Sequence, residues 1–410
     1  MAVLQLRSHI PISAPARREP TDGTESPMRV VLGFEPAWFH KRCEVDVSER
    51  WHKDPYYRYQ TLKRMKAELV KAFPSVSYWD LSYEEDLATI SGCYGAYVIP
   101  QVFGLPLLYA PDRWPLVDPE KKLSIEEIEN LDIEKLLQGP FVEELFHQMD
   151  VIESEWGKIH GYLNWQGILN NAFHLRGQEI FTDTYERPDF VNQFLSLICE
   201  VMIRLATRAQ ERQRRSGFYV NQFSVSNCVV NMISPEMYRK FVFPHDRRIA
   251  LSFERFGVHT CNWNITPYLE VLKELPNLGY LDMGMMSDMM KVKEMFPETR
   301  RAVMYSPVIL QDAPLETIRS DMEKILQELS PCDIVMADIQ ATTPDERVRE
   351  LLETCRGLES ENSAVSQGPL PDGEEVMENR SEECGFPKSE GKGEGVYEHN
   401  GSSGEKEGGS

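Results

Sequence analysis

Short apolar runs rich in β-branched residues alternate with longer amphipathic stretches through the middle of the chain. Phe194, Ile198, Met202 and Leu205 recur at spacings of three and four, which is typical of a helix lying on a sheet. The apolar runs predict strands at 75–81, 97–104, 159–167, 217–226, 258–262, 278–284, 302–308 and 333–340. The amphipathic stretches predict helices at 55–73, 141–157, 187–215, 235–256, 266–274, 288–296, 315–329 and 344–356.

Eight predicted strands, most of them followed by a helix, favour a single (β/α)8 or TIM barrel of the α/β class. A doubly wound sheet is the alternative arrangement of the same elements. No GxGxxG follows the first predicted strand and no GxxxxGK[ST] occurs, so the phosphate-binding loops typical of nucleotide-binding sheets are not supported. In a barrel, functional residues are expected at the C-terminal ends of the strands.

Composition separates the predicted barrel, residues 28–356, from two flanking segments. Residues 1–27 are rich in Pro, Arg, Ser and Thr, and they predict a flexible leader. Residues 357–410 hold eleven of the 25 glycines and few large apolar side chains, so they predict a disordered acidic tail. We therefore expect one folded domain between two disordered ends.

Charge and cysteine usage narrow the class of protein. The net charge of −21 argues against nucleic acid or an anionic membrane surface as the main partner. No run of eighteen apolar residues predicts a membrane span, and the leader lacks the apolar core of a secretory signal. The eight cysteines form no CxxC pair, which favours free thiols in a reducing cytoplasm. We expect a cytoplasmic protein with a small-molecule substrate, and a homodimer is one candidate assembly.

The sharpest local feature is His259-Thr260-Cys261 at the end of a predicted strand. Residues i and i+2 of a strand face the same side, so the imidazole and the thiol can converge on one point. A histidine nitrogen with a cysteine thiolate suits zinc better than magnesium or calcium. The alternative is a buried thiol beside a hydrogen-bonded histidine.

Asp282 and Asp338 end two of the later predicted strands, each after an apolar run. An unpaired carboxylate is costly to bury there, so each predicts a metal ligand, a general base or a substrate contact. The alternative is a helix-capping or structural role at a βα turn. A mononuclear catalytic metal site needs three protein ligands and an open position, so convergence of these groups would favour metal.

Further polar residues at predicted strand ends are candidates for catalysis or substrate binding. They are Asp80, Asn164, Gln166, Ser224, Cys228 and Ser306. In the segment WFHKRC, Trp38, Lys41 and Arg42 bring aromatic and cationic groups together, which would suit closure over an anionic ligand.

Several segments resemble the uroporphyrinogen decarboxylase superfamily over about residues 28–356. They include NMISPEMYRKFVFPHDRRI, VHTCNWNITPYLEVLKELPNLGYLDMG and DIVMADIQATTPDERVRELLE. The resemblance implies a TIM barrel. It also implies one of two chemistries, because the superfamily contains cofactor-free decarboxylases and corrinoid-linked methyltransferases. The RQAGRY motif that characterises the decarboxylases is replaced here by FHKRCE, which lacks the glycine, the second arginine and the tyrosine.

The resemblance to the methyltransferase branch implies zinc held by the HxC pair, His259 and Cys261. Asp338 lies nearest to the position of that branch's last cysteine, and Asp282 matches an acidic position found in related zinc enzymes. This branch implies transfer of a methyl group between a small substrate and a corrinoid or thiol, with the corrinoid arriving on a separate carrier protein. The resemblance to the decarboxylases implies the alternative, a cofactor-free lyase.

That lyase would act on a tetrapyrrole or a smaller polycarboxylate. Asp80, Lys41 and Arg42 would contact its substrate, and no metal would be needed.

Overall fold

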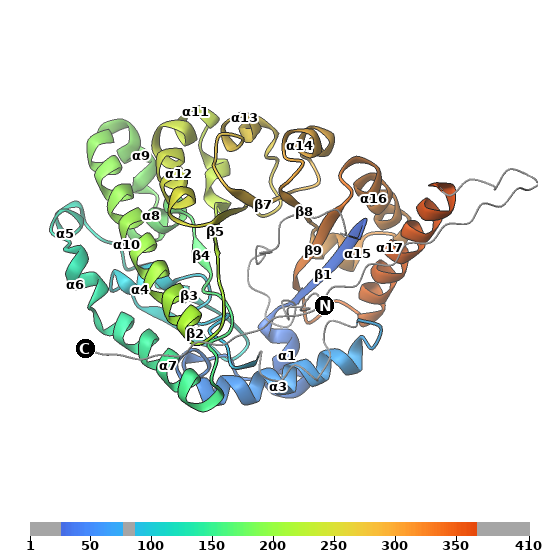
Figure 1. The fold of residues 1–410 in the computed structure, drawn as a ribbon, viewed down its shortest axis with the longest axis horizontal. Coiled ribbons are helices and arrows are strands. Elements are labelled where there is room, and N and C mark those ends of the chain that lie inside the picture. Colours follow the sequence, from blue (N-terminus) through green and yellow to red (C-terminus); the bar gives the residue numbers. More distant parts are fainter. Residues whose placement is uncertain (1–25, 77–86, 367–410) are drawn as a thin grey trace, which may run out of the picture. The chain divides into compact units, whose positions relative to one another are not determined.

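The computed structural model describes residues 26–76 and 87–366 of the chain. Within them, parallel strands form a seven-stranded sheet in the order β1-β9-β8-β7-β6-β5-β4, and helices lie outside it (Figure 1). The strands of this sheet are β1 (Met28–Phe34), β4 (Trp165–Gln166), β5 (Gln222–Ser226), β6 (Arg255–His259), β7 (Leu278–Met283), β8 (Arg300–Met304) and β9 (Cys332–Ile339). A separate antiparallel hairpin consists of β2 (Leu107–Ala110) and β3 (Arg113–Val117).

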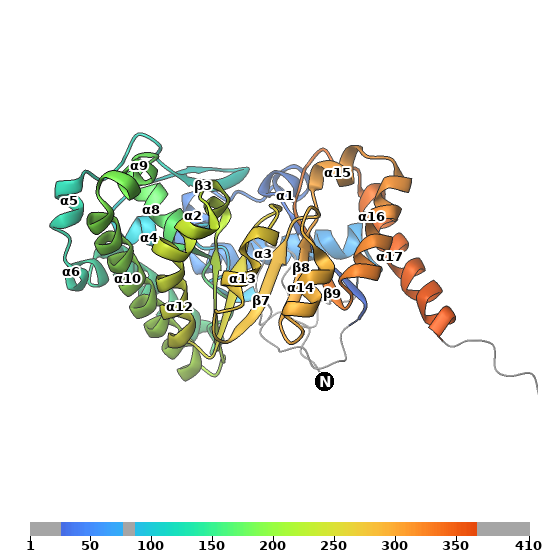
Figure 2. The ribbon, with the colours of Figure 1, turned by 90° about the horizontal axis from the view of Figure 1, so that it is seen from above.

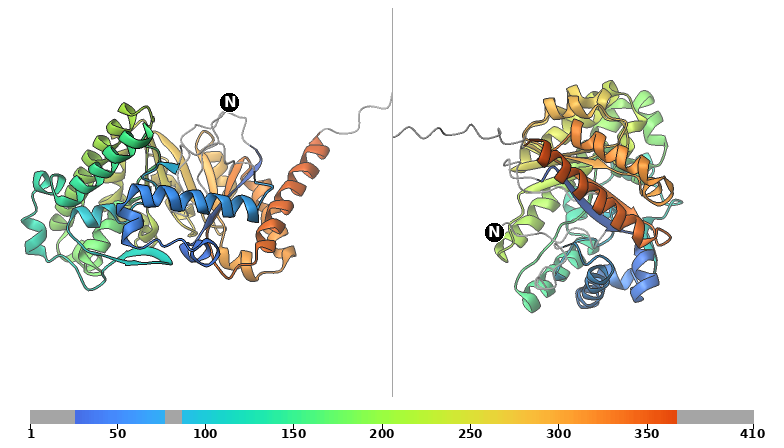
Figure 3. Two further views of the ribbon diagram at one scale, coloured as in Figure 1. Left: turned by 90° about the horizontal axis from the view of Figure 1, so that it is seen from below. Right: turned by 90° about the vertical axis from the view of Figure 1, so that its right-hand side faces the viewer.

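The helices cover the outer side of the strands. Those of the first half are α1 (Pro36–Cys43), α2 (Glu49–Lys53), α3 (Pro55–Ala72), α4 (Val98–Val102), α5 (Ile125–Glu129), α6 (Ile133–Leu137), α7 (Pro140–Trp156), α8 (Ile168–Arg176) and α9 (Glu179–Glu186). Those of the second half are α10 (Pro188–Arg215), α11 (Pro235–Met237), α12 (Phe243–Ser252), α13 (Leu269–Leu272), α14 (Met289–Met295), α15 (Pro307–Asp312), α16 (Leu315–Glu328) and α17 (Asp345–Ser366). Figure 2 shows α15, α16 and α17 beside β9, and Figure 3 shows the blue helix α3 and the orange-red helix α17 outside the strands.

This alternation of parallel strands and outer helices is TIM-barrel architecture, which confirms the predicted fold class. Strand β8 is buried at every position and β7 at all but its first. Parallel strands covered on both faces are rich in apolar residues, which made β7 recognisable. The predicted strand at 302–308 overlaps β8 only at 302–304, because Arg300 and Arg301 begin the strand and α15 begins at Pro307.

The first strand of the barrel, β1, is absent from the sequence prediction. It pairs in parallel with β9 from Met28 to Leu32 and again at Phe34, with a register shift between the two. This pairing places the first described strand of the chain beside the last one. Glu35, which follows β1, therefore lies at the same end of the barrel as the residues that end β9.

Two predicted strands need correction. Residues 97–104 contain helix α4 and not a strand. Val98, Ile99 and Val102 are all buried, and a short apolar run that is buried on every side does not distinguish a helix from a strand in the sequence. Of residues 159–167, only β4 is a strand, and His160 adds a single parallel bridge to Thr89.

The predicted helix at 235–256 is divided into α11, a π-helical turn at Tyr238–Val242 and α12. The predicted helix at 266–274 is a 3-10 turn at Thr266–Tyr268 followed by α13. Residues 77–81 of the first predicted strand lie outside the described residues.

Helix α17 continues beyond Arg356, where the sequence places the start of the tail. Leu358 is buried, and the Glu359 carboxylate accepts a hydrogen bond from the Met28 backbone N–H at 2.8 Å. Residues 357–366 therefore belong to the last helix. Residues 1–25 and 367–410, which hold most of the predicted leader and tail, lie outside the described residues.

Helix α10 is the one described helix long and apolar enough to cross a membrane by length and composition. Its buried side chains recur along one face and include Phe194, Ile198, Met202 and Leu205. It contacts α8, α9 and α12. This one-sided burial is what a core helix of an α/β fold shows.

The loop after β7 contains a glycine, Gly284, whose position leaves no room for a side chain. A Cβ placed on Gly284 would lie 1.8 Å from the backbone oxygen of Asn262. The Gly284 N–H also donates to the backbone oxygen of Trp263 at 3.0 Å. The loop after β7 therefore packs directly against the loop after β6.

We expect Gly284→Ala to lower the free energy of unfolding by about 3 kcal/mol, because backbone must move to admit the methyl group. Gly357→Ala is the matched control, since a Cβ there meets nothing within 4 Å and the residue lies inside α17. This control should raise stability by about 0.5–1 kcal/mol. Urea titration of the two variants measures both effects, and a neutral Gly357→Ala would contradict the helical assignment of residues 357–366.

Candidate functional site

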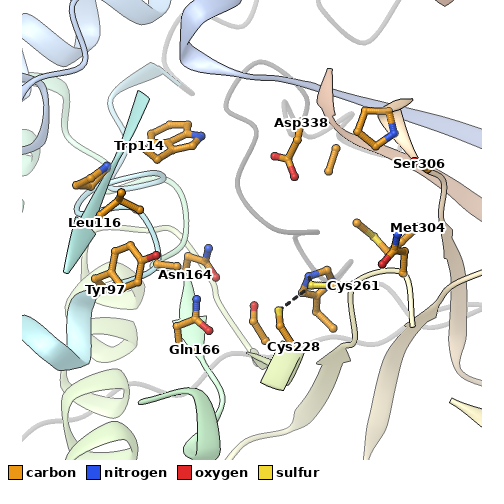
Figure 4. A pocket seen from close by; sticks show the side chains of 18 of the residues that line it. Tyr97, Trp114, Leu116, Asn164, Gln166, Cys228, Cys261, Met304, Ser306 and Asp338 are labelled. Carbon is orange, nitrogen blue, oxygen red and sulfur yellow. Dashed lines mark hydrogen bonds between the residues drawn. The ribbon is translucent and has the colours of Figure 1, made fainter. Parts of the chain in front are cut away.

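A pocket of about 380 Å³ opens at the C-terminal ends of the barrel strands (Figure 4). The ends of β4, β5 and β6 supply Asn164, Gln166, Ser226, Cys228, His259, Cys261 and Asn262 to its lining. The ends of β8 and β9 supply Met304, Tyr305, Ser306, Pro307, Ala337 and Asp338. Hairpin residues Trp114, Pro115 and Leu116, together with Tyr97, add apolar and aromatic surface. This volume suits a small-molecule ligand.

Cys228, His259 and Cys261 place their ligating atoms within 4.8 Å of one another. His259 is the last residue of β6, Cys261 follows two positions later, and Cys228 begins a 3-10 turn after β5. The Cys261 thiol donates to Cys228 Sγ at 2.8 Å, and Cys261 Sγ lies 3.3 Å from His259 Nε2. Among the described residues, this is the one cluster of at least three such groups with metal-binding geometry.

Asp282 fixes the orientation of the His259 ring from beneath. Its Oδ2 atom lies 2.6 Å from His259 Nδ1, and its Oδ1 atom accepts from the Thr260 N–H at 2.6 Å. The Tyr280 hydroxyl donates to Oδ2 at 3.0 Å. Because a carboxylate accepts but does not donate, Nδ1 carries the proton and Nε2 is directed at the thiols. This carboxylate–histidine arrangement is typical of metal-bound histidine.

Of the three ligand groups, only Cys228 is favoured in its deprotonated form before a metal binds, so zinc would displace protons from His259 Nε2 and from Cys261. A hydrogen bond from Cys261, opposed by burial and helped by His259, lowers the pKa of the Cys228 thiol to about 5. Donating that hydrogen bond, together with burial, raises the pKa of Cys261. Burial opposes a charge on His259, but the Asp282 carboxylate and Cys261 raise the pKa of His259 well above its usual value. The metal-free cluster is therefore polarised as an imidazolium beside a thiolate.

A buried polar network holds the backbone next to Cys228. The Asn227 N–H donates to the His259 backbone oxygen at 2.7 Å, which ties the ends of β5 and β6 together. The Asn227 side chain donates to Asp246 Oδ2 at 2.9 Å, and Tyr238 in the π-helical turn donates to the same oxygen at 2.8 Å. These contacts bring Cys228 to the His259 side of the pocket.

The donor set fits zinc. Two sulfur atoms and one imidazole nitrogen are the ligands that zinc favours, and three protein ligands beside an open pocket match a catalytic zinc site. The low pKa of Cys228 and the fixed Nδ1–H of His259 supply the thiolate and the correct ring tautomer.

Asp338 lies on the other wall of the pocket, away from Cys228 and Cys261 (Figure 4). Its carboxyl group forms a hydrogen bond with that of Glu35. Burial, then the charge and hydrogen bond of Asp338, raise the pKa of Glu35 to about 7. Desolvation by the surrounding pocket raises the pKa of Asp338 as well, although the charge of His259 and the hydrogen bond with Glu35 lower it. The described structure thus places a carboxyl pair opposite the cluster.

The structure distributes the predicted site residues unevenly. Asn164, Gln166, Cys228, His259, Cys261, Ser306 and Asp338 line the pocket. Asp338, the expected third metal ligand, is not in the ligand cluster, and Cys228, expected only as a substrate contact, takes that place. Asp282 lies fully buried behind His259 rather than in the lining. Asp80 lies outside the described residues.

Trp38, Lys41, Arg42 and Ser224 do not line the pocket. Trp38 is buried in the core against Phe34, and Lys41 is exposed on α1. Arg42 lies over the Trp38 ring and forms an ion pair with Asp345, with 2.6 Å between Nη2 and Oδ2. Ser224 accepts a hydrogen bond from Gln222 Nε2 at 3.0 Å. The cationic side chains expected to meet an anionic ligand thus lie outside the pocket lining.

Several site residues escaped the sequence analysis. Glu35 follows a strand that was not predicted, although its position after the run MRVVLGF was a usable signal. Thr260 and Tyr280 flank the motif residues and act through Asp282. Trp114 reaches the pocket from the hairpin, and no sequence pattern links that hairpin to the barrel mouth.

Comparison with known proteins agrees with this architecture. No curated protein sequence matches the chain. A solved methyltransferase from Methanosarcina mazei is similar in fold, with a TM-score of 0.57 at 17% sequence identity over 83% of this chain and 95% of that one. At this identity the likeness concerns the fold alone. The family model described as uroporphyrinogen decarboxylase (URO-D) matches residues 86–358. This match spans most of the chain and all three cluster residues, and the chain therefore belongs to the uroporphyrinogen decarboxylase family.

Proposed function

We propose that this protein is a zinc-dependent methyltransferase that moves a methyl group between a small substrate and a corrinoid or thiol. The observation that carries the proposal is the Cys228–His259–Cys261 cluster at the open end of the barrel. The fold likeness to a methyltransferase is compatible with it. The proposal makes the chain an enzyme whose chemistry differs from that of its family's name.

Each residue of the cluster has a definite part in this proposal. His259 would hold zinc through Nε2, and Cys228 and Cys261 through their sulfur atoms. Bound zinc would supply a Lewis acid that keeps a substrate thiol ionised at neutral pH or polarises a methyl-bearing heteroatom. Asp282 keeps the His259 ring in one tautomer and orientation, while Tyr97 and Trp114 give another side of the pocket an aromatic lining.

The size of the pocket bears on the partner. A volume of about 380 Å³ holds a small substrate but not an entire corrinoid together with it. We therefore propose that a corrinoid, where it takes part, approaches the open mouth on a separate carrier protein.

The decarboxylase alternative receives less support. No lysine or arginine is among the described residues that line the pocket, and Arg42 is paired with Asp345 elsewhere. A polycarboxylate would face the Asp338 carboxyl and the ionised thiol of Cys228, and the one cationic group in the described lining, the His259 imidazolium, is already paired with Asp282.

The first prediction concerns metal content. Wild-type protein reconstituted with zinc should retain one ion per chain, and Cys228→Ser, His259→Ala and Cys261→Ser should each lose stoichiometric zinc, because each removes one of three ligands. Cys43→Ser, a half-buried thiol in α1, is the matched control and should retain it. Elemental analysis after gel filtration measures the outcome. Full zinc in Cys228→Ser with loss in Asp338→Asn would instead assign Asp338 as the ligand.

The second prediction concerns the carboxylate behind the ring. Asp282→Asn should weaken zinc binding by roughly 10–100-fold, because an amide no longer fixes the proton on His259 Nδ1. Tyr280→Phe keeps the carboxylate and removes only one of its hydrogen bonds, so its effect should be smaller. Competition with a chelator of known affinity measures both. Equal zinc affinity in Asp282→Asn and wild type would contradict the role given to this side chain.

The third prediction tests the reaction itself. Zinc-loaded protein should transfer methyl groups between free cobalamin and a panel of small thiols and methylated donors, followed by cobalamin absorbance. Removal of zinc, or Cys261→Ala, should abolish the transfer. Decarboxylation of a tetrapyrrole by the protein in place of methyl transfer, with or without zinc, would contradict the proposal.

A further inference from the structure

The backbone of β9 is distorted at the residue that carries the pocket carboxyl. Between Leu32 and Phe34, strand β1 advances two residues while β9 advances three, from Met336 to Ile339. Asp338 lies within that extra step and has a left-handed φ of 61°. A bulge of this kind redirects a side chain out of the regular strand alternation, and such bulges are common beside active sites. The fold thus presents Asp338 to the pocket.

Glu35 stands directly beside this bulge. Its N–H donates to the Ile339 backbone oxygen at 3.0 Å, which fixes it next to Asp338. Glu35 occupies the N-cap position of α1, yet its side chain makes no capping hydrogen bond there. Its carboxyl is therefore available for the hydrogen bond with Asp338. One proton between two adjacent carboxyl groups relieves their mutual repulsion.

The two carboxyl groups of the pair have different charged neighbours. Burial raises the pKa of Asp338, the charge of His259 across the pocket and the hydrogen bond with Glu35 lower it, and the charge of Cys228 raises it. The group that acts on Glu35 is Asp338. Asp338 lines the pocket and Glu35 does not, so a proton held by the pair is exchanged with a pocket ligand through Asp338. Glu35 lies outside the lining and holds the proton when Asp338 does not.

We propose that the Glu35–Asp338 pair holds one proton for a demethylation reaction, that Asp338 is the general acid that delivers it to the donor, and that Glu35 is the positioning residue that shares it. This inference rests on the proposed methyl transfer and deepens it by naming the class of donor: a neutral thioether, amine or ether bearing a methyl group. The apolar and aromatic part of the lining, which includes Trp114 and Tyr97, admits such a donor.

The step balances as a heterolytic transfer. The carbon–heteroatom bond of the donor breaks, and a new bond forms between that methyl carbon and the acceptor, a thiolate or a cobalt(I) corrinoid. The electron pair of the broken bond stays on the donor heteroatom, which takes the proton of Asp338. The products are the methylated acceptor, the protonated demethylated donor and ionised Asp338, which regains a proton from solvent through the pair.

The first test measures the shared proton without turnover. Zinc-loaded full-length protein carrying ¹³C-labelled Glu and Asp carboxyl groups is titrated by NMR, and Glu35→Gln identifies the Glu35 signal. Its midpoint should lie near pH 7 in wild type and fall by about one pH unit or more in Asp338→Asn. Asparagine at position 338 tolerates the left-handed backbone found there. Glu44→Gln, at the far end of α1, is the control and should leave the Glu35 midpoint unchanged. An unchanged midpoint in Asp338→Asn would overturn the sharing.

The second test compares two donors with free cobalt(I) cobalamin as acceptor. Dimethyl sulfide loses methanethiolate, which needs a proton, whereas trimethylsulfonium loses neutral dimethyl sulfide, which needs none. Asp338→Asn should slow transfer from dimethyl sulfide by roughly 10²–10⁴-fold and leave transfer from trimethylsulfonium nearly unchanged. With dimethyl sulfide, the wild-type rate should fall as pH rises through about 7, where the pair loses its proton, and Glu35→Gln should shift that limb.

The outcomes separate this inference from the function on which it rests. Equal slowing of both donors, or of neither, overturns the acid role while methyl transfer itself stands. If wild type uses neither these donors nor any other methylated donor or thiol, the proposed function fails and the acid role fails with it, whatever the titration shows.

Discussion

The hydrogen bond between His259 and Asp282 is the interaction on which the site depends. It joins the ends of β6 and β7, whose pairing sets Val258 opposite Leu281. A slip of one residue would turn one of the two side chains to the other face of the sheet. Asp282 is fully buried, and donors from three residues, His259, Thr260 and Tyr280, compensate for the loss of water. The register between β6 and β7 therefore also determines the tautomer and orientation of the His259 ring.

Much of this could be inferred from the sequence, since apolar runs followed by polar residues mark the ends of buried parallel strands. That logic placed His259, Cys261 and Asp282 at the barrel mouth and predicted a metal at the first two. It did not identify Cys228 as a ligand, because the contact depends on the turn after β5 and on the Asn227 hydrogen bond to the His259 backbone. Such a contact between neighbouring strands leaves no periodic trace in the sequence.

The remaining disagreements have similar causes. The segment containing Trp38 and Arg42 matched the residue types of an anion site, but α1 turns the indole into the core, and Asp345 from the far end of the chain neutralises the guanidinium. Strand β1 was overlooked, and with it Glu35. The bulge that directs Asp338 into the pocket depends on the pairing of β1 with β9, so neither strand alone reveals it.

Two residues that line the pocket have a left-handed backbone conformation. Cys261 and Asp338 have φ values of 59° and 61°, and both line it from opposite walls. Non-glycine residues in the left-handed region are held there at some energetic cost, which the surrounding fold offsets. A divalent ion held by two thiolates and a neutral imidazole would carry no net charge, so the half-protonated carboxyl pair would set the electrostatic preference of the pocket. Under the proposed function, the lining of this barrel would then disfavour polycarboxylates, although the chain belongs to a decarboxylase family, since one fold can carry different chemistries.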